Sequence, residues 1–198
     1  MARASNLWRR SPLLITRWDM TEQQDERQLV LRVQAGDTSA FEQLLVRLHR
    51  PLRAYLRGMV GPAMVDDVMQ EVALRIFRQI QFLLEPRAFR AWAQRIATRV
   101  ALANLQRDKR WRELETDPGI IDGLPAPDAR DLAEFESDFL ALVERVSPAS
   151  RAVILLHYQQ HFSLEETAAI LDIPLGTAKS RLAYGVATLR KSILEKAK

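Results

Sequence analysis

The spacing of the apolar residues constrains this chain more than any other feature. Along nearly the whole sequence apolar residues recur every three or four positions, as in Val65, Val68 and Val72, and we find no stretch in which they alternate as in a strand. This spacing matches one face of an α-helix. Apolar residues make up 47% of the 198 residues, enough to fill the core of one domain or of two small ones. We therefore predict an all-α fold.

Several classes of function are disfavoured by what the sequence lacks. The chain has no cysteine, so a disulfide framework, a thiolate zinc site and a cysteine nucleophile are excluded. It has no glycine-rich phosphate loop, and no apolar run approaches the roughly 20 residues of a membrane helix. We expect a soluble cytoplasmic protein that is not an enzyme, with no catalytic residue, no metal, no cofactor, no small-molecule substrate and no membrane insertion.

The first 24 residues are expected to lie outside the fold. Residues 1–18 contain four arginines and no acid, a composition that superficially resembles an organellar transit peptide. The simpler interpretations are a disordered basic tail, or a start codon assigned too early with Met20 as the true initiator.

A first domain is predicted over residues 25–112, with helices between about Asp25 and Arg110. Gly36-Asp37 is predicted to be a turn, and Ser39 and Glu42 have the spacing of a capping box. The helix that follows carries an apolar stripe of Phe41, Leu44, Leu45, Leu48, Leu52 and Leu56. Pro51 lacks an amide donor and is expected to kink or restart this helix, and Gly61-Pro62 should end it.

Two further helices complete the predicted first domain. One begins at about Ala63 and places its charged residues opposite its apolar ones. Residues 83–88 form a loop, because Pro86 disfavours a helical conformation at Glu85. The next helix spans Phe89 to Arg110. From Arg87 to Arg112 there are eight Arg or Lys residues against one acid, which suits a polyanionic partner.

The composition changes sharply after this basic block. Residues 113–138 carry nine acids and one base, and prolines and glycines interrupt them. We predict an extended acidic linker over 113–131 and a second domain over 132–198. In that domain Ser147 and Pro148 have the order of an N-cap and a first helical residue, and the helix should continue through Tyr158.

The last segment has the pattern of a helix-turn-helix. Ser163 and Glu166 form a capping box, Asp172 suits the left-handed residue of the turn, and 175–191 is the predicted recognition helix. The start of this helix is small, polar and basic, as entry into the major groove requires. The predicted DNA-binding residues here are Gly176, Thr177, Lys179, Ser180, Arg181 and Tyr184. Gly185, inside the same helix, should cost about 1 kcal/mol relative to alanine, with no compensation evident in the sequence.

Two strings in the chain resemble one family. Residues 163–168 and 174–182, SLEETA and PLGTAKSRL, look like region 4 of the extracytoplasmic-function (ECF) sigma factors, which carry RNA polymerase to promoters. Residues 67–72, DVMQEV, look like region 2 of the same family, and GD at 36–37 with AF at 40–41 matches its opening helix. The two motifs stand in the family's order, and the likeness extends from Leu29 to Ile193. It implies a sigma factor with regions 2 and 4 only.

The resemblance assigns roles to both predicted domains. In the family the first domain binds the clamp helices of the polymerase β′ subunit and melts the −10 element, the loop at 83–88 closes a pocket for a flipped base, and the second domain recognises the −35 element. Core RNA polymerase, including its β flap, promoter DNA and an anti-sigma factor are the implied partners. The implied polymerase-binding residues are Asp67, Gln70, Glu71 and Leu74. The implied −10 residues are Arg87, Arg95, Arg99, Asn104, Arg107, Lys109 and Arg110. Phe89, Trp92 and Trp111 could stack on a base, although Phe89 and Trp92 have the spacing of core residues.

Two other functions compete with this interpretation. His157, His161 and Glu165 lie four residues apart, a spacing that can present metal ligands on one helical face, but the capping box at Ser163 would break that face. A helix-turn-helix regulator that never joins polymerase is the second alternative. It would explain the second predicted domain and leave the first one unexplained.

Overall fold

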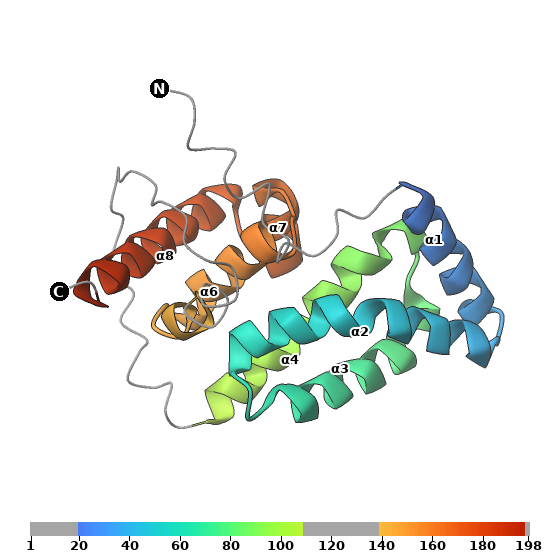
Figure 1. Cartoon of the computed structure of the whole chain (residues 1–198). Coiled ribbons are helices and arrows are strands. Elements are labelled where there is room, and N and C mark those ends of the chain that lie inside the picture. Colours follow the sequence, from blue (N-terminus) through green and yellow to red (C-terminus); the bar gives the residue numbers. More distant parts are fainter. Residues whose placement is uncertain (1–19, 109–138, 197–198) are drawn as a thin grey trace. The chain divides into compact units, whose positions relative to one another are not determined.

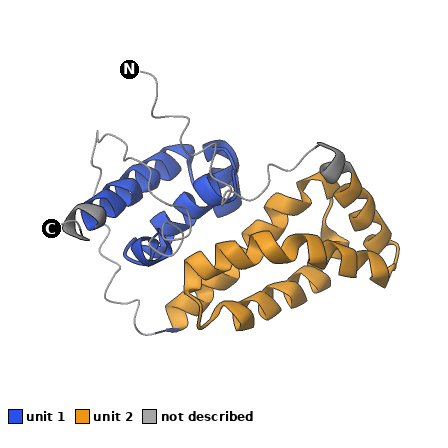
Figure 2. Cartoon of the chain, in the orientation of Figure 1, with its two compact units in different colours: residues 1–15, 108–198 blue, residues 16–107 orange. Residues whose placement is uncertain are grey.

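The computed structural model describes residues 20–108 and 139–196 (Figure 1). Every regular element in these two ranges is helical and none is a strand, so the prediction of an all-α fold is confirmed. No helix within them is long and apolar enough to cross a membrane. The described chain divides into two compact units (Figure 2), one ending at Arg107 and the other containing residues 139–196. The predicted acidic linker lies outside the described residues, and so does the predicted tail up to residue 19. Residues 20–24 of that tail form the start of the first helix, so the fold begins earlier than predicted.

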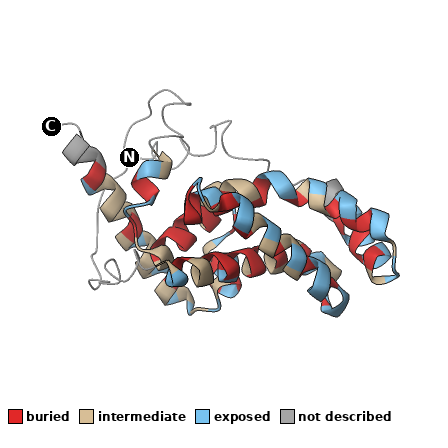
Figure 3. Ribbon diagram, turned by 90° about the horizontal axis from the view of Figure 1, so that it is seen from below, coloured by how far each residue is buried: buried red, intermediate tan, exposed pale blue. Residues whose placement is uncertain are grey.

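The N-terminal unit is built from four helices and two short turns. They are α1 (Met20–Gln34), α2 (Thr38–Val60), α3 (Val65–Gln79), the 3-10 turns η2 (Ile80–Phe82) and η3 (Pro86–Ala88), and α4 (Phe89–Arg107). Helices α2, α3 and α4 each contact the other two, and α1 lies against α2 and both turns. The apolar stripes meet between them, as the buried residues in Figure 3 show. The most deeply buried members include Leu44, Leu56, Val72, Ile76 and Val100.

Asp37, not Ser39, caps the start of α2. The Asp37 carboxylate accepts from the backbone N of Ser39 at 3.0 Å and of Ala40 at 3.2 Å, and the residue has the extended backbone of an N-cap (φ −79°, ψ 102°). The Ser39 hydroxyl and the Arg32 guanidinium also donate to this carboxylate, and together these bonds lower the pKa of Asp37 to about 2. The predicted capping box at Ser39 and Glu42 is therefore wrong by two residues.

Helix α2 continues through Pro51 without a restart. Proline removes one backbone hydrogen bond, but Leu48, Pro51 and Leu52 are all buried, so packing on both sides of the proline favours a single helix. Of the predicted kink or restart at Pro51, the restart is wrong. The helix ends at Gly61, which has a positive φ of 80°, and the prediction of an end at Gly61-Pro62 is confirmed.

A buried hydrogen-bond chain joins α2 to α4. The Tyr55 hydroxyl lies 2.7 Å from Thr98 Oγ1, and the Thr98 hydroxyl donates to the carbonyl oxygen of Gln94 at 2.9 Å. Because threonine has a single hydroxyl proton, Tyr55 is the donor to Thr98. Burial raises the pKa of the Tyr55 phenol. This chain fixes the position of α4 along α2, since a slip would leave buried hydroxyls without partners.

In the described part of the C-terminal unit, a helical segment at 139–143 is followed by α6 (Pro148–Ile154), the π-helical turn η5 (Leu155–Gln159), α7 (Leu164–Leu171) and α8 (Leu175–Lys196). Ser147 is the N-cap of α6 and Pro148 its first residue, as predicted. Helix α8 packs against α6 and α7. It is five residues longer than the predicted recognition helix.

Arg151 ties the residues before α6 to that helix. Its side chain is almost fully buried and donates to the carbonyl oxygens of Glu144 and Val146, the latter at 3.1 Å. Burial lowers the pKa of Arg151 to about 10. The guanidinium stays charged at neutral pH and holds the turn at 144–147 in place.

Gly185 has a packing role that the sequence did not reveal. A Cβ atom at this position would lie 2.5 Å from Ile154 Cδ1 and 3.2 Å from Ile154 Cγ1, closer than packed carbon atoms come. The absence of a side chain therefore allows α8 to approach α6 closely. This close approach is a compensation for the helical cost of Gly185 that was not evident in the sequence.

Candidate polymerase and promoter surfaces

One exposed stripe of α3 combines acidic, polar and apolar side chains. Asp67, Gln70, Leu74 and Phe77 follow at helical spacing, and the inward face of the helix is buried. Leu74 and Phe77 are 49% and 50% exposed, which is high for large apolar residues. Phe77 was not among the predicted site residues, although its position three residues after Leu74 could have indicated it. Its ring contacts Phe41 of α2 at a centroid distance of 4.9 Å.

Glu71 connects this stripe to α4. One carboxylate oxygen accepts from Arg75 Nη2 at 2.6 Å and the other from Asn104 Nδ2 at 3.0 Å. The bond from Asn104, followed by the bond and charge of Arg75, holds the pKa of Glu71 below its usual value. A predicted polymerase-binding residue and a predicted DNA-binding residue are thus bound to each other within the free protein.

The predicted basic residues of α4 do not all share one face with Asn104. At about 100° per residue, Arg95 and Arg99 lie about 40° apart, whereas Asn104 lies about 180° from Arg95. The structure accordingly places Asn104 against Glu71 of α3, with Arg99 and Arg107 exposed and Arg95 half-buried. Lys109 and Arg110 lie outside the described residues, and so does Trp111.

Two aromatic residues lie at the start of α4. Phe89 is buried, as its spacing predicted, whereas Trp92 is only partly buried. Their ring centroids are 6.0 Å apart. Trp92 thus has both a core neighbour and an accessible portion.

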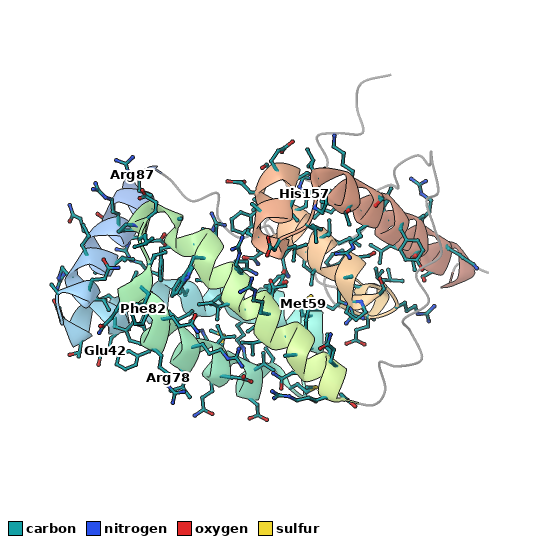
Figure 4. The ribbon with its side chains drawn as sticks, turned by 180° about the vertical axis from the view of Figure 1, so that it is seen from behind. Glu42, Met59, Arg78, Phe82, Arg87 and His157 are labelled. Carbon is teal, nitrogen blue, oxygen red and sulfur yellow. The ribbon has the colours of Figure 1, made fainter. Side chains whose placement is uncertain are left out.

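The loop between α3 and α4 contains two short turns, η2 and η3, and a side chain caps the second of them. Glu85 is extended (φ −115°, ψ 96°), as the following Pro86 predicted, and its carboxylate accepts from the backbone N of Arg87 at 3.1 Å. This cap begins η3, a short turn that the sequence did not predict. Phe82 and Leu84 are 78% and 98% exposed. Figure 4 labels Phe82 and Arg87, which extend from this loop.

The helix-turn-helix forms with the predicted local interactions. Ser163 and Glu166 make a reciprocal capping box, with distances of 2.8 and 3.1 Å, and Asp172 has the predicted left-handed backbone (φ 58°, ψ 47°). The Ile173 amide donates a hydrogen bond to the Ala168 carbonyl oxygen at 3.1 Å, which completes the turn.

The start of α8 is open and mostly polar. Gly176 and Lys179 are exposed, and a Cβ at Gly176 would meet no atom within 4 Å. Thr177, Ser180, Arg181 and Tyr184 are partly exposed. The Ser180 hydroxyl donates to the Thr177 carbonyl at 3.0 Å, which leaves its oxygen as an acceptor. The inward side of the same turns is anchored by the buried Ala178.

The three residues considered as metal ligands do not lie on one helical face. His157 Nδ1 lies 2.8 Å from the Phe162 carbonyl oxygen, and His161 has a positive φ of 59° in the turn before α7. Within residues 20–108 and 139–196 no group of three or more His, Asp or Glu side chains could hold a metal ion. Nothing in this geometry favours the enzyme alternative.

Comparisons with known proteins account for both units. Residues 44–112 match the family described as Sigma-70 region 2, and residues 137–189 match Sigma-70 region 4. The chain is 30% identical over 174 residues to the ECF RNA polymerase sigma-E factor of Escherichia coli K12, covering 82% of this chain and 91% of that protein. The chain belongs to the ECF sigma factors.

Another relative and two solved structures agree with this assignment. The ECF RNA polymerase sigma factor SigE of Mycolicibacterium smegmatis is 32% identical over 153 residues, covering 74% of this ECF sigma factor and 59% of that one. The structure of CnrH in complex with the cytosolic domain of CnrY is similar with a TM-score of 0.62 and 26% identity, over 88% of this chain and 99% of that one. The sigma factor RpoE of Bartonella quintana, solved with the anti-sigma factor NepR, shares the fold with a TM-score of 0.57 and 22% identity, over 76% and 94% of the two chains.

Membership of this family indicates the general function of the protein. It is a transcription initiation factor that works with RNA polymerase on promoter DNA. A DNA-binding regulator that never joins polymerase would not account for the region 2 match over residues 44–112. The family consists of initiation factors and not of enzymes.

Proposed function

We propose that this ECF sigma factor divides its work among three surfaces. The α3 stripe binds the β′ clamp helices of core polymerase, the basic side of α4 with the loop at 83–88 engages and melts the −10 element, and the start of α8 recognises the −35 element. The proposed domains are residues 20–112 and 132–198, joined by the acidic linker at 113–131, in a protein that acts in the cytoplasm. The C-terminal domain also contacts the β flap. The α3 stripe is the observation on which the proposal mainly rests.

The α3 stripe suits a protein partner. Leu74 and Phe77 are half-exposed, and covering their apolar surface would contribute favourable free energy to the binding of a partner. The polar side chains of Asp67 and Gln70 beside them would supply specificity. Glu71 is held in place by Asn104 and Arg75, so its carboxylate has one fixed orientation. We assign Asn104 to this surface, as a residue that orients Glu71, rather than to direct DNA contact.

The exposed, arginine-rich side of α4 suits the binding of a DNA strand that is being separated from its complement. Arg99 and Arg107 are exposed, Arg87 projects from the adjoining loop, and Lys109 and Arg110 continue the basic run in the sequence. Arginine binds backbone phosphates without regard to base identity. Extruding a base costs a few kcal/mol, and partly exposed Trp92 offers a face on which a base can stack.

The start of α8 suits a duplex major groove. Lys179 and Arg181 reach for bases or phosphates, while Gly176 lets the helix end approach the backbone closely. Thr177, Ser180 and Tyr184 offer hydroxyl groups on the same turns. We propose that these six residues make the −35 contact.

An anti-sigma partner is also proposed for this protein. Among the similar structures, the sigma factor RpoE is bound to the anti-sigma factor NepR, and CnrH is bound to the cytosolic domain of CnrY. An anti-sigma factor that covers the α3 stripe would compete with core polymerase for the same apolar side chains.

Reconstituted transcription tests the three surfaces separately. Overexpressing the protein and mapping the RNA 5′ ends that then appear identifies a promoter. Run-off transcription from that promoter with purified core polymerase then measures initiation. Leu74→Ala should weaken core binding, with exposed Val46→Ala as control. Arg99→Ala should weaken binding to a fork-junction promoter probe, with exposed Arg50→Ala as control. Lys179→Ala should weaken binding to a duplex −35 probe, with exposed Lys191→Ala, farther along α8, as control. Failure of the wild-type protein to bind core polymerase would contradict the proposal.

A further inference from the structure

The loop between α3 and α4 is held by one side chain from α1. Gln34 Nε2 donates to the carbonyl oxygen of Ile80 at 3.0 Å and to that of Leu83 at 2.9 Å. These carbonyls lie at the two ends of η2, so a single amide group uses both of its protons to hold the turn. Gln34 is the last residue of α1, a helix that has no part in the three proposed surfaces.

Some side chains of this loop are buried in the core and others are exposed. Ile80 and Leu83 are buried, whereas Phe82 is 78% and Leu84 98% exposed. The Leu83 amide also donates to the Ile80 carbonyl at 3.2 Å. Because the Gln34 bonds fix the orientation of the peptide groups at 80 and 83, they determine that Leu83 points inward and Leu84 outward.

The end of the loop is fixed by a separate interaction. The Glu85 carboxylate caps η3 through the amide of Arg87, and Pro86 restricts the backbone beside it. The loop thus presents an apolar side chain and a guanidinium from a backbone held at two places. An unstacked base offers an apolar face and its phosphate offers a negative charge, which matches this pair of groups.

We propose that Gln34 is a positioning residue for promoter melting, which holds the 80–88 loop in the conformation that presents Leu84 and Arg87 to the separated strand. This inference rests on the proposed function, in which the loop contacts the melted −10 element. Gln34 does not touch DNA itself. Because Gln34 already restricts the loop in the free protein, the loop loses less conformational entropy when DNA binds, and binding is tighter.

Binding assays on the full-length protein in complex with core polymerase test the proposal. The probes are a fork-junction promoter DNA with a single-stranded −10 segment and a duplex that carries only the −35 element. Gln34→Ala should weaken fork-junction binding about tenfold and leave core affinity and −35 binding unchanged. Gln34→Glu should be at least as weak, because its carboxylate would face two carbonyl oxygens. Gln28→Ala, at an exposed position of the same helix, is the matched control.

A double-mutant cycle separates positioning from general stabilisation. If Gln34 acts by placing Leu84, the Gln34→Ala effect should fall below about threefold in a Leu84→Ala background. Hydrogen exchange of the amides at 81–85, 87 and 88 should accelerate in Gln34→Ala, with α2 and α4 still protected. Full additivity of the two substitutions, or an equal loss of core affinity, would overturn the positioning role.

The two proposals can fail separately in this experiment. If the wild-type holoenzyme does not bind the fork-junction probe, the proposed function of the loop fails. If the wild type binds and Gln34→Ala binds equally well, only the role of Gln34 fails.

Discussion

The two units of this sigma factor are held in different ways. In the C-terminal unit the helix-turn-helix depends on neighbours in sequence, such as Ser163 with Glu166 and the left-handed Asp172. In the N-terminal unit the decisive bonds join distant residues, such as Gln34 with Leu83 and Tyr55 with Thr98. A DNA-reading motif can therefore be set by a short string of residues, whereas the surfaces of the N-terminal unit depend on how its helices pack.

The strongest challenge to this contrast is Gly185, a long-range determinant within the locally capped unit. Gly185→Val should destabilise the C-terminal unit by about 3 kcal/mol, because the added side chain overlaps Ile154. Calorimetry and segment-resolved hydrogen exchange measure the loss. Gly176→Val is the matched control, since its Cβ meets no neighbour, and it should stay within about 0.5 kcal/mol of wild type. Ile154→Ala should partly rescue Gly185→Val, and additive losses would contradict the packing explanation.

The second prediction tests the buried chain between α2 and α4. Thr98→Val should cost about 2 kcal/mol, because it leaves the buried Tyr55 hydroxyl without its acceptor. The double variant Tyr55→Phe with Thr98→Val removes both partners and should recover most of that loss. Denaturant unfolding measures both values. If the double variant is less stable than Thr98→Val alone, the bond is not the cause.

The same chain predicts a pH dependence. Folding raises the pKa of Tyr55 above its ordinary value of 10, so the folded state holds this proton more tightly than the unfolded state does. The resulting stability is complete below about pH 10 and declines as the pH rises further. Tyr55→Phe should flatten this alkaline decline, which denaturant unfolding at increasing pH measures.

The fourth prediction tests the local interactions that hold the helix-turn-helix. Ser163→Ala removes the N-cap of α7 and should destabilise the C-terminal unit by about 1 kcal/mol. Hydrogen exchange should accelerate first in α7 and the turn after it. An unchanged α7 would mean that packing, and not the cap, holds the first helix of the motif.

The smallest effect is expected at the turn itself. Asp172→Gly should be neutral or stabilising by a few tenths of a kcal/mol, since glycine adopts a positive φ without strain. Asp172→Val should instead be destabilising by roughly 1 kcal/mol. Thermal unfolding of the two variants ranks them, and the reverse order would rule out left-handed strain as the determinant.

The contrast also explains which features the sequence could predict. The capping box at Ser163, the left-handed Asp172 and the extended Glu85 each depend on residues within about four positions, and all three predictions are confirmed. At the start of α2 two good N-cap residues compete, and Arg32, five positions before Asp37, adds a bond that favours Asp37. The sequence alone does not rank them.

Features that depend on distant partners could not be predicted. At Pro51 a kink or a restart was predicted from the lost hydrogen bond, but the buried neighbours that favour one continuous helix are known only from the fold. The close contact between Gly185 and Ile154 likewise depends on tertiary packing. The candidate site divides similarly. The stripe on α3 and the start of α8 follow from spacing, whereas the positions of Asn104 against Glu71 and of Gln34 against the loop require the tertiary fold. The role of each surface residue remains a prediction.

The bonds of Glu71 have a consequence for any protein that covers α3. Both of its oxygens already accept hydrogen bonds from within the unit, one from Asn104 and one from Arg75. A partner that covers this acidic group therefore displaces fewer water molecules from it than from a carboxylate with no such bonds. Folding therefore removes part of the water around this carboxylate before a partner binds. The remaining desolvation cost on binding is smaller than for a fully hydrated carboxylate, so the charge can lie beside an apolar contact.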